Sequence, residues 1–386
     1  MRPLGGYEAG VRVLHVIADL GTYGAQNLVG QLIRELRNEP DCRVEALTIY
    51  SPEVAFDAGA ALGVPVHDLA RRGRRDLSFL PRLVAAIRRL RPDIVHTHMH
   101  HGKYWGRLAA ILAGVPTIVH TEHNSDFRPP HPLFGRLNRV LHAKTTAIVA
   151  FSEPHRAALA RDEHLALERI AIIPNGITPS PPDRAAARAA LGAGDETFAV
   201  VHVGRLATVK NQLLALDAWE QLTQAQPGMQ LIFVGDGPDR EMLADQVALR
   251  GLHGVRFLGF REDAHALIAG ADVALVTSRN EAMPLAMIEA MQAGVPVVSS
   301  DWHGAREMLG FGAYGLVAAA DGASLAAAIT AVANDPAAAA ERAGSAQRHA
   351  LAEFAIATTA RRYAALYRSL SSRARSASAV ITAARS

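Results

Sequence analysis

Short apolar runs alternate along the chain with longer segments whose apolar residues recur at helical spacing. The first apolar run, 11–18, is followed by a turn with two glycines, 19–24, and by a helical pattern over 25–36. A short apolar run is typical of a buried strand, and a helical period is typical of an amphipathic helix. Strand, glycine turn and helix in this order predict the opening unit of a doubly wound α/β domain, with the helix start directed at the ligand-binding edge of the sheet.

The same alternation continues through the first half of the chain. Further strands are predicted at 43–49, 65–69, 93–97, 117–121, 143–151 and 169–173. Helices are predicted at 80–90 and 104–113, and the second of them ends at Gly114. Alternating strands and helices favour a parallel sheet, in which the residues that follow the strands share one rim.

A second unit of the same type begins at Phe198. Its predicted strands are 198–203, 230–234, 255–260 and 272–277, and its first helix is 211–222. The preceding segment, 178–197, combines three prolines with an Ala/Arg-rich helical stretch and predicts a linker. The end of the chain, 373–386, is rich in Ser, Ala and Arg and predicts a loose tail.

The stretch 278–300 predicts a loop with Glu281, a helix opened by Pro284 and closed by Gly294, and a buried strand. Proline suits the first helical position, where its missing N–H would be unpaired anyway, and glycine suits the left-handed residue after a helix. Glu289 falls in the second turn of this otherwise apolar helix, and an unpaired buried carboxylate is costly. From these residues alone, Glu289 either has a partner or lies on the solvated side, and Glu281 could be an ordinary loop acid.

Length and composition indicate a globular enzyme of two domains. A chain of 386 residues is too long for one ordinary core and fits two domains of roughly 170 to 190 residues. The single cysteine, Cys42, permits no intrachain disulfide, which fits a reducing compartment. No signal peptide or membrane-spanning apolar stretch is evident, so a cytoplasmic protein is the default expectation.

The net charge of +3 does not require nucleic acid as a partner. Residues 1–180 hold 22 Lys and Arg against 17 Asp and Glu, a net of +5, which leaves −2 for the remainder. Much of this excess is Arg71, Arg72, Arg74, Arg75, Arg82, Arg88, Arg89 and Arg91. Such a run is either a solvated helix face or a surface attracted to an anionic membrane, where each basic residue contributes about 1 kcal/mol. The same field would serve a phosphate-bearing acceptor.

The stretch 278–300 resembles the Glu-x7-Glu signature of retaining glycosyltransferases with the GT-B fold, specifically family 4. The matching residues are Ser278, Glu281, Pro284, Leu285, Glu289, Ala290, Met291, Gly294, Pro296, Val297 and Val298. Elsewhere, Gly204, Arg205 and Leu206 with Lys210, and the Pro-Asn-Gly at 174–176, also match the family. Ala282 replaces the family's usual glycine, a departure expected to narrow the sugar pocket.

The resemblance implies two doubly wound Rossmann-like domains facing a deep cleft. Residues 1–177 would form the acceptor-binding domain, 178–197 the linker and 198–355 the nucleotide-sugar-binding domain. A terminal helix, 356–372, would pack back on the first domain, before the tail 373–386.

The resemblance also assigns roles to single residues. By this resemblance, the catalytic residues are Arg205, Lys210, Glu281 and His123. By the same resemblance, the donor-binding residues are Gly24, Gly204, Glu289, Gly259, Phe260, Arg261, Met283, Pro284 and Leu285. In the family, the first glutamate contacts hydroxyls of the donor sugar and the second holds the ribose. Arg and Lys suit a departing diphosphate, because Arg places two donors on phosphate oxygens and Lys supplies a compact charge.

Five histidines, His98, His100, His101, His120 and His123, fall near the predicted rim of the first sheet. A metal site is disfavoured, because zinc ligands form a compact set of definite spacing, while these residues come from two strand ends. The family generally binds its donors without a metal, and no Asp-x-Asp motif is present. By resemblance, His123 lies beside the reacting sugar. His98 is either a group on the acceptor side or a core histidine.

The expected reaction is transfer of a sugar from a UDP-, GDP- or ADP-sugar to an acceptor hydroxyl with retention of configuration. The expected acceptor is a glycan or a polyprenyl-diphosphate-linked saccharide of bacterial cell-surface polysaccharide synthesis, which leaves peripheral contact with the inner face of the membrane open. Neither a metal, a further cofactor nor nucleic acid is expected. The alternatives are a sugar-nucleotide epimerase or hydrolase of the same architecture and a non-catalytic nucleotide-sugar-binding subunit.

Overall fold

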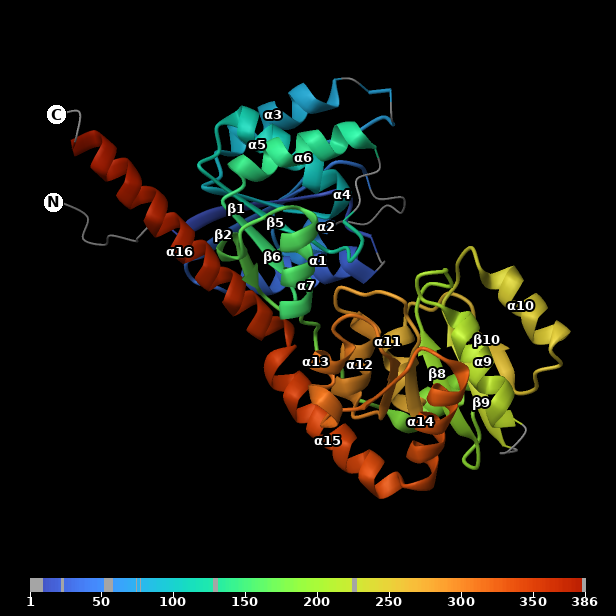
Figure 1. Cartoon of the computed structure of the whole chain (residues 1–386). Helices are drawn as coiled ribbons and strands as arrows, with labels where there is room; N and C mark the ends of the chain where they lie inside the picture. The colour runs from blue at the N-terminus through green and yellow to red at the C-terminus, as the bar shows by residue number, and fades with distance from the viewer. Residues whose placement is uncertain are drawn as a thin grey trace. The chain divides into compact units, whose positions relative to one another are not determined.

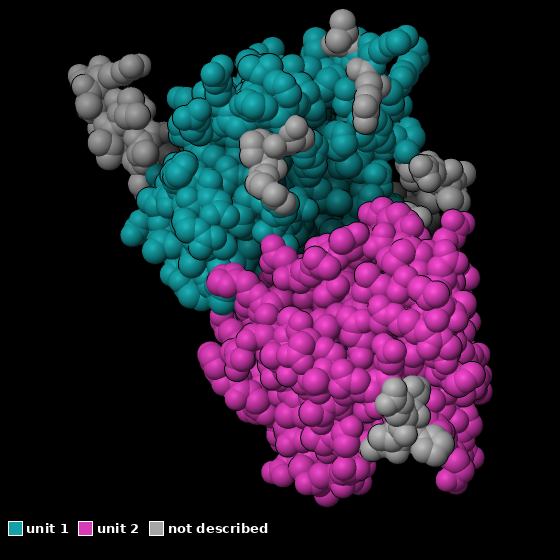
Figure 2. Space-filling model, turned by 45° about the vertical axis from the view of Figure 1, so that its right-hand side comes forward, with its two compact units in different colours: residues 1–176, 356–386 teal, residues 177–355 magenta. Residues whose placement is uncertain are grey.

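The computed structural model describes residues 10–21, 24–51, 58–73, 75–76, 78–127, 131–223 and 228–383, so Arg74 lies outside the described residues. The chain forms two compact units (Figure 2). Unit 1 consists of residues 1–176 and 356–386, and unit 2 of residues 177–355. Within the described residues, no helix is both long enough and apolar enough to cross a lipid bilayer.

Unit 1 is built on a parallel sheet of seven strands in the order β3-β2-β1-β4-β5-β6-β7. The strands are β1 Val11–Ile17, β2 Cys42–Thr48, β3 Val66–Asp68, β4 Ile94–His98, β5 Thr117–Thr121, β6 Ala147–Ala150 and β7 Ile170–Ile172. The central strands β4 and β5 are buried along their whole length, as expected for parallel strands covered by helices on both faces.

The helices of unit 1 include short 3-10 and π segments. They are α1 Gly24–Leu36, α2 Ala58–Leu62, α3 Phe79–Leu90, α4 Met99–His101, η1 Gly102–Gly106, α5 Arg107–Ala113, α6 Pro132–Lys144, α7 Glu153–Asp162, η2 Leu167–Arg169 and α16 Ile356–Ala383. The helix predicted from 104 starts as the π turn η1. Its glycines allow this segment to approach the sheet, because a Cβ on Gly102 would lie 3.0 Å from the Val16 carbonyl oxygen.

Helix α16 belongs to unit 1 although it is the last element of the chain (Figure 1). It packs against α1, β1 and β5, and its residues Tyr363, Tyr367 and Leu370 join the same buried cluster as Ile33 and Leu36. The helix continues to Ala383, whereas the sequence predicted a loose tail from 373. Alanine and arginine both have high helix propensity, so this composition can extend a helix that is already anchored.

Helix α6 was not predicted, and the strand predicted from 143 was wrong at its start. The structure places Ala143 and Lys144 in α6 and begins β6 at Ala147. The missed signal is a proline in the first turn preceded by His131, whose side chain accepts a hydrogen bond from the Leu133 amide. A proline in the first helical turn is a typical start signal.

Unit 2 repeats the architecture with six parallel strands in the order β10-β9-β8-β11-β12-β13. The strands are β8 Phe198–Val203, β9 Met229–Val234, β10 Val255–Phe257, β11 Val273–Val276, β12 Val297–Ser300 and β13 Leu316–Ala318. The helices are α8 Arg184–Leu191, α9 Gln212–Thr223, α10 Arg240–Leu249, α11 Ala264–Leu267, η3 Ile268–Gly270, α12 Leu285–Ala293, α13 Ala305–Met308, η4 Gly310–Gly312, α14 Gly322–Asn334 and α15 Pro336–Glu353. The predicted fold class, two Rossmann-like α/β domains, is confirmed.

The segment 178–197, predicted as a linker, lies within unit 2. Its helix α8 is attached through Asp272, whose carboxylate binds Arg184 at 2.6 Å and Arg188 at 3.1 Å. The same carboxylate accepts a hydrogen bond from the Ala199 amide at 2.7 Å, which joins α8 to the first strand of the unit. These contacts attach the helical part of the segment, α8, to the folded unit.

Candidate functional site

The first group of candidate residues lies at the carboxyl edge of the unit 2 sheet. Strands β8 and β11 are neighbours, and the strand order reverses between them. In doubly wound sheets, ligands bind outside the carboxyl ends of the strands at such a reversal. The loop after β8 carries Gly204, Arg205 and Lys210, and the loop after β11 carries Ser278 and Glu281.

Hydrogen bonds to the end of β9 and to the loop that follows it fix the backbone of the loop after β8. The Gly204 amide donates to the Val234 carbonyl at 3.0 Å and the Leu206 amide donates to the Asp236 carbonyl at 3.0 Å. Only glycine fits at 235, because a Cβ there would lie 2.1 Å from the Gly204 oxygen. This packing holds the Arg205 backbone, while its exposed side chain has no hydrogen bond or ion pair with any residue that the structure describes.

Lys210 and Glu281 form an ion pair across the reversal point, with 2.5 Å between Nζ and Oε1. The Ser278 hydroxyl donates to the same Glu281 oxygen at 2.7 Å, and the Thr277 hydroxyl donates to the Lys210 carbonyl at 2.9 Å. Both charged side chains are partly shielded from solvent, being 26% and 14% exposed. The sequence assigned these two residues to separate parts of the donor, and the structure joins them directly.

Helix α12 begins one residue later than predicted. Pro284 is the N-cap residue, and Gly294 ends the helix in the left-handed conformation with φ 71°, as expected. Ala282 is buried and has no positive φ, so this backbone does not require the glycine that the family uses. Met283 and Pro284 are buried, and Leu285 is half-buried, beside the Glu281 loop.

Glu289 lies in the second turn of α12 among buried residues such as Ile288 and Ala290. Within the described parts of the chain, its carboxylate has no hydrogen-bond donor, and burial raises its pKa to about 7. The side chain is therefore neither paired, as the sequence suggested it should be, nor on a solvated face. A partly accessible, unpaired carboxylate of this kind suits a ligand with hydroxyl donors.

The residues 259–261 lie at the same edge of the unit 2 sheet. The Gly235 amide donates to the Gly259 carbonyl at 2.8 Å, so this loop follows the turn after β9. Gly259 has φ 72°, a left-handed conformation that favours glycine. Phe260 is 50% exposed, whereas the Arg261 guanidinium is held by Asp263 at 2.7 Å. Of the side chains in this loop, Phe260 is the one that remains exposed.

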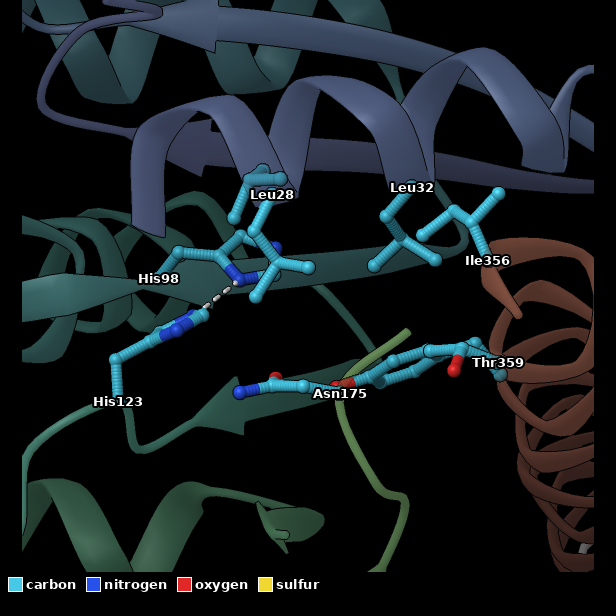
Figure 3. Close-up of a pocket in the computed structure, with 9 residues that line it drawn as sticks. Leu28, Leu32, His98, His123, Asn175, Ile356 and Thr359 are labelled. Atoms are coloured by element: carbon cyan, nitrogen blue, oxygen red, sulfur yellow. Dashed lines mark hydrogen bonds between the residues drawn. The ribbon is translucent and has the colours of Figure 1, made fainter. Parts of the chain in front are cut away.

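The second group of candidate residues lies in unit 1, where neighbouring strands β4 and β5 end at His98 and just before His123. The His98 Nδ1 and His123 Nε2 atoms are 3.2 Å apart (Figure 3), and the His98 Nε2 lies 2.9 Å from the Nδ1 of His15 on β1. Both His15 and His98 are fully buried. His123 and His98 also line a pocket with about 240 Å³ of empty space, open solvent included.

The other predicted rim histidines do not join this chain of rings. His120 is buried inside β5 and bonded to Thr97, while His100 and His101 lie in α4. His15 and His96 were missed as members of the cluster. They pair in register across β1 and β4, so the alternation of side chains along a strand was the available signal.

A metal site is the obvious alternative use of buried histidines. Among the described residues, His15, His96 and His98 form the group whose nitrogens all lie within 4.8 Å of one another. However, both nitrogens of His96 have hydrogen bonds, to the Tyr367 hydroxyl at 2.7 Å and to Thr121 at 2.8 Å. Both nitrogens of His98 also have partners, so a metal would displace existing bonds. That the protein needs no metal remains a prediction.

Gly24 starts α1 at the carboxyl end of β1 and is exposed. A Cβ at this position would meet no atom within 4 Å. The structure therefore offers no steric reason for glycine here, and the assignment of Gly24 to the donor diphosphate remains a prediction from resemblance.

A buried ion network positions the loop that carries His123. The Lys103 ammonium binds Glu122 at 2.7 Å and Glu163 at 2.8 Å. Burial alone would raise the pKa of the Glu122 carboxyl, but the positive charge of Lys103 holds it well below its usual range. Arg107 in the same network is fully buried, which lowers its pKa to about 10. The Glu122 carboxylate also accepts the Asn124 amide at 3.1 Å, so both neighbours of His123 are fixed.

The Glu289 carboxyl predicts a measurable pH dependence of stability. Its pKa is raised on folding from 4.5 to about 7, so the unfolded chain ionises first and stability falls as pH rises between these values. Glu289→Gln removes this titration. Relative to wild type, the variant should gain on the order of 2 kcal/mol in unfolding free energy between pH 4.5 and 8. Urea unfolding measures this difference, with exposed Glu341→Gln on α15 as the control. An equal difference at both pH values would contradict the assignment.

Comparison with known proteins identifies the family of the chain. The family described as Glycosyltransferase Family 4 matches residues 22–180, and the family described as Glycosyl transferases group 1 matches residues 183–350. A phosphatidyl-myo-inositol mannosyltransferase of Mycobacterium leprae is 31% identical over 325 residues, which are 80% of this chain and 83% of the mannosyltransferase.

Two further similarities concern a nucleotide sugar and the fold. A UDP-Gal:alpha-D-GlcNAc-diphosphoundecaprenol alpha-1,3-galactosyltransferase of Escherichia coli is 29% identical over 247 residues, 60% of this chain and 63% of that enzyme. The crystal structure of Anabaena HepE in complex with UDP and glucose has a TM-score of 0.81 at 23% identity and covers 93% of this chain and 100% of that chain. The chain belongs to glycosyltransferase family 4 and is a glycosyltransferase that uses a nucleotide sugar.

Proposed function

We propose that the protein transfers a sugar from a nucleotide-diphosphate sugar to an acceptor hydroxyl with retention of the anomeric configuration. The observation that carries this proposal is the Lys210–Glu281 pair at the reversal point of the unit 2 sheet. Arg205 lies in the same loop as Lys210, and its side chain has no partner among the described residues. Family membership favours a transferase over the non-catalytic subunit considered from the sequence.

Each group of this edge suits one part of the donor. Arg205 has no competing carboxylate among the described residues and would bind the diphosphate, whose negative charge grows as the glycosidic bond breaks. Glu281 uses Oε1 for Lys210 and Ser278, while its Oε2 has no bond within the described residues and would accept a sugar hydroxyl. The Glu289 carboxylate, which has no hydrogen-bond donor among the described residues, would accept the ribose hydroxyls.

The proposed reaction is a same-face substitution. The bond between the anomeric carbon and the diphosphate oxygen breaks, that oxygen takes the proton of the acceptor hydroxyl, and the acceptor oxygen bonds the anomeric carbon from the same side. Lys210 and Arg205 stabilise the leaving diphosphate, and Glu281 holds Lys210 in place. No covalent nucleophile is required in this scheme.

For the substrates, we favour a UDP-sugar as donor, with GDP- and ADP-sugars as alternatives. The Escherichia coli relative is named for a UDP-Gal donor and a diphosphoundecaprenol-linked acceptor. By this similarity, the acceptor of this chain is a polyprenyl-diphosphate-linked saccharide of cell-surface polysaccharide synthesis, with the enzyme acting in the cytoplasm on the inner face of the membrane.

The membrane contact is supported by the outer face of α6. Leu133 and Val140 are 61% and 63% exposed there, and Arg136, Arg139 and Lys144 are exposed on the same helix. We call these five residues the α6 surface. Exposed apolar residues among basic ones suit an anionic lipid interface. The basic stretch 71–91 contributes less than expected from the sequence, because Arg88 donates to the Leu112 carbonyl at 2.6 Å and two further arginines serve internal contacts. They are Arg71 over the Phe79 ring and Arg82 bonded to Asp76.

Replacing Arg205 or Lys210 by alanine should lower kcat by about 10²–10³-fold, because each removes a preorganised charge that stabilises the leaving group. The assay uses labelled UDP-, GDP- and ADP-sugars with a polyprenyl-diphosphate-linked acceptor, and NMR of the product reads its anomeric configuration. Arg348→Ala, an exposed arginine on α15, is the control. Normal turnover of both variants would exclude these roles, and an inverted product would exclude retention. Donor consumption without acceptor would instead indicate the epimerase or hydrolase.

The α6 surface should bind vesicles that contain anionic lipid. Leu133→Asp combined with Val140→Asp should weaken this binding about tenfold or more, because two apolar contacts are lost and two negative charges face the anionic surface. Co-sedimentation at two salt concentrations measures the effect. The control is Leu249→Asp on α10, which alters an apolar residue that is 80% exposed in unit 2. Equal binding of the double variant and wild type would exclude α6 as the contact.

A further inference from the structure

We infer that His98 is a positioning residue that holds His123 in one ring orientation and one tautomer, with the proton on Nδ1 of His123. This inference rests on the proposed function, in which His123 lies beside the reacting sugar. In this tautomer His123 can donate a hydrogen bond to a ligand through Nδ1, because its Nε2 is occupied by His98. The Nδ1 atom has no hydrogen-bond partner among the residues that the structure describes.

Three imidazoles form a continuous chain from the core to His123. His15 and His98 are joined through Nδ1 and Nε2 at 2.9 Å, and His98 and His123 through Nδ1 and Nε2 at 3.2 Å. Burial lowers the pKa of His15 to about 3 and that of His123 to about 4, so these rings are neutral near pH 7. A neutral imidazole has one donor and one acceptor nitrogen. Both hydrogen bonds must therefore run in the same direction along the chain.

The environment of His15, at the buried end of the three rings, determines the direction of these hydrogen bonds. His15 Nε2 is buried and has no hydrogen-bond partner in the part of the chain that the structure describes. If the bonds ran from His123 inward, this atom would carry a buried N–H without an acceptor. If the bonds ran outward, His15 Nε2 would be a buried acceptor without a donor. Orphaned buried N–H groups are rare in proteins, whereas under-satisfied acceptors are less so. The outward direction is therefore favoured, and it places a proton on Nδ1 of His15, His98 and His123.

His98 has little freedom to turn. The His96 ring packs against it with 4.1 Å between ring centroids, and His96 is bonded to the Tyr367 hydroxyl of α16. On the pocket side, Leu28 of α1 lies beside His98, whereas Leu32 of α1 and Ile356 of α16 lie farther along the pocket, and Asn175 lies on the side of His123 (Figure 3). The apolar Leu28 side chain offers the His98 ring no competing hydrogen bond.

Two conservative variants of His98 separate its two hydrogen bonds. An asparagine amide can occupy the place of Nδ1 and keep the donor to His123, whereas a glutamine amide reaches the place of Nε2 and keeps only the contact with His15. Orienting partners of metal-bound imidazoles contribute a factor of roughly 10 to 100, so His98→Gln should lower kcat about tenfold. The KM for the donor should stay within about twofold of wild type. His98→Asn should retain most of the turnover.

Nitrogen-15 NMR of labelled histidine tests the tautomer without relying on turnover. His123 should carry its proton on Nδ1 in wild type and His98→Asn, and should lose this single tautomer in His98→Gln. The control is His349→Asn on α15, because His349 stacks on Tyr314 in unit 2, outside the chain of rings. An Nε2 proton on His123 in wild type, or identical spectra of the two His98 variants, would overturn the inference. Stoichiometric binding of added Zn²⁺ that shifts His15, His96 and His98 would also overturn it.

The same experiments distinguish failure of the inference from failure of the proposed function. If His123→Ala retained full turnover, the role of His123 beside the sugar would be lost. The NMR spectra would then still decide whether His98 sets the tautomer of His123. If turnover fell but the tautomer did not depend on His98, the positioning role alone would be wrong.

Discussion

The parallel pairing of strands is the constraint on which every candidate site in this protein depends. Because all strands of a sheet point the same way, the loops that follow them meet at one edge. Lys210 and Glu281 are 71 positions apart in the sequence, yet they form an ion pair because β8 and β11 are neighbours. In unit 1, the neighbouring strands β4 and β5 bring His98 and His123 together in the same way.

Much of the fold could be predicted because its signals are local. The strand β8 matches its predicted range 198–203, and Gly294 ends α12 as glycine chemistry requires. The residues of the candidate site were assigned only through resemblance to a family, and their roles stay predictions. A lysine five residues after an arginine carries no meaning by itself. The departure at Ala282 proved compatible with the loop, since its backbone lies in the region open to any residue.

The contacts between distant side chains could not be predicted from one sequence. Lys103 finds Glu122 and Glu163 only once α7 and the strand β5 are packed, and no local pattern encodes that meeting. The contacts among the three histidines could not be predicted for the same reason, because His15 and His98 come from different strands. Helix α6 was missed because its exposed face is partly apolar and its buried face partly polar, which weakens the helical pattern. These buried polar contacts are costly unless complete, so they also make the unit 1 core specific.

Helix α16 has a consequence for how the chain is made. Unit 1 contains both the first and the last elements, and Tyr363, Tyr367 and Leu370 complete a core begun by β1 and α1. A ribosome delivers the chain from its N-terminus, and domains tend to fold as they emerge. Here the core of unit 1 cannot be completed, and part of its apolar surface stays uncovered, until all of unit 2 and then α16 have been synthesised. The domain encoded first is thus the one that finishes folding last, and premature termination would leave it open to aggregation or to chaperones.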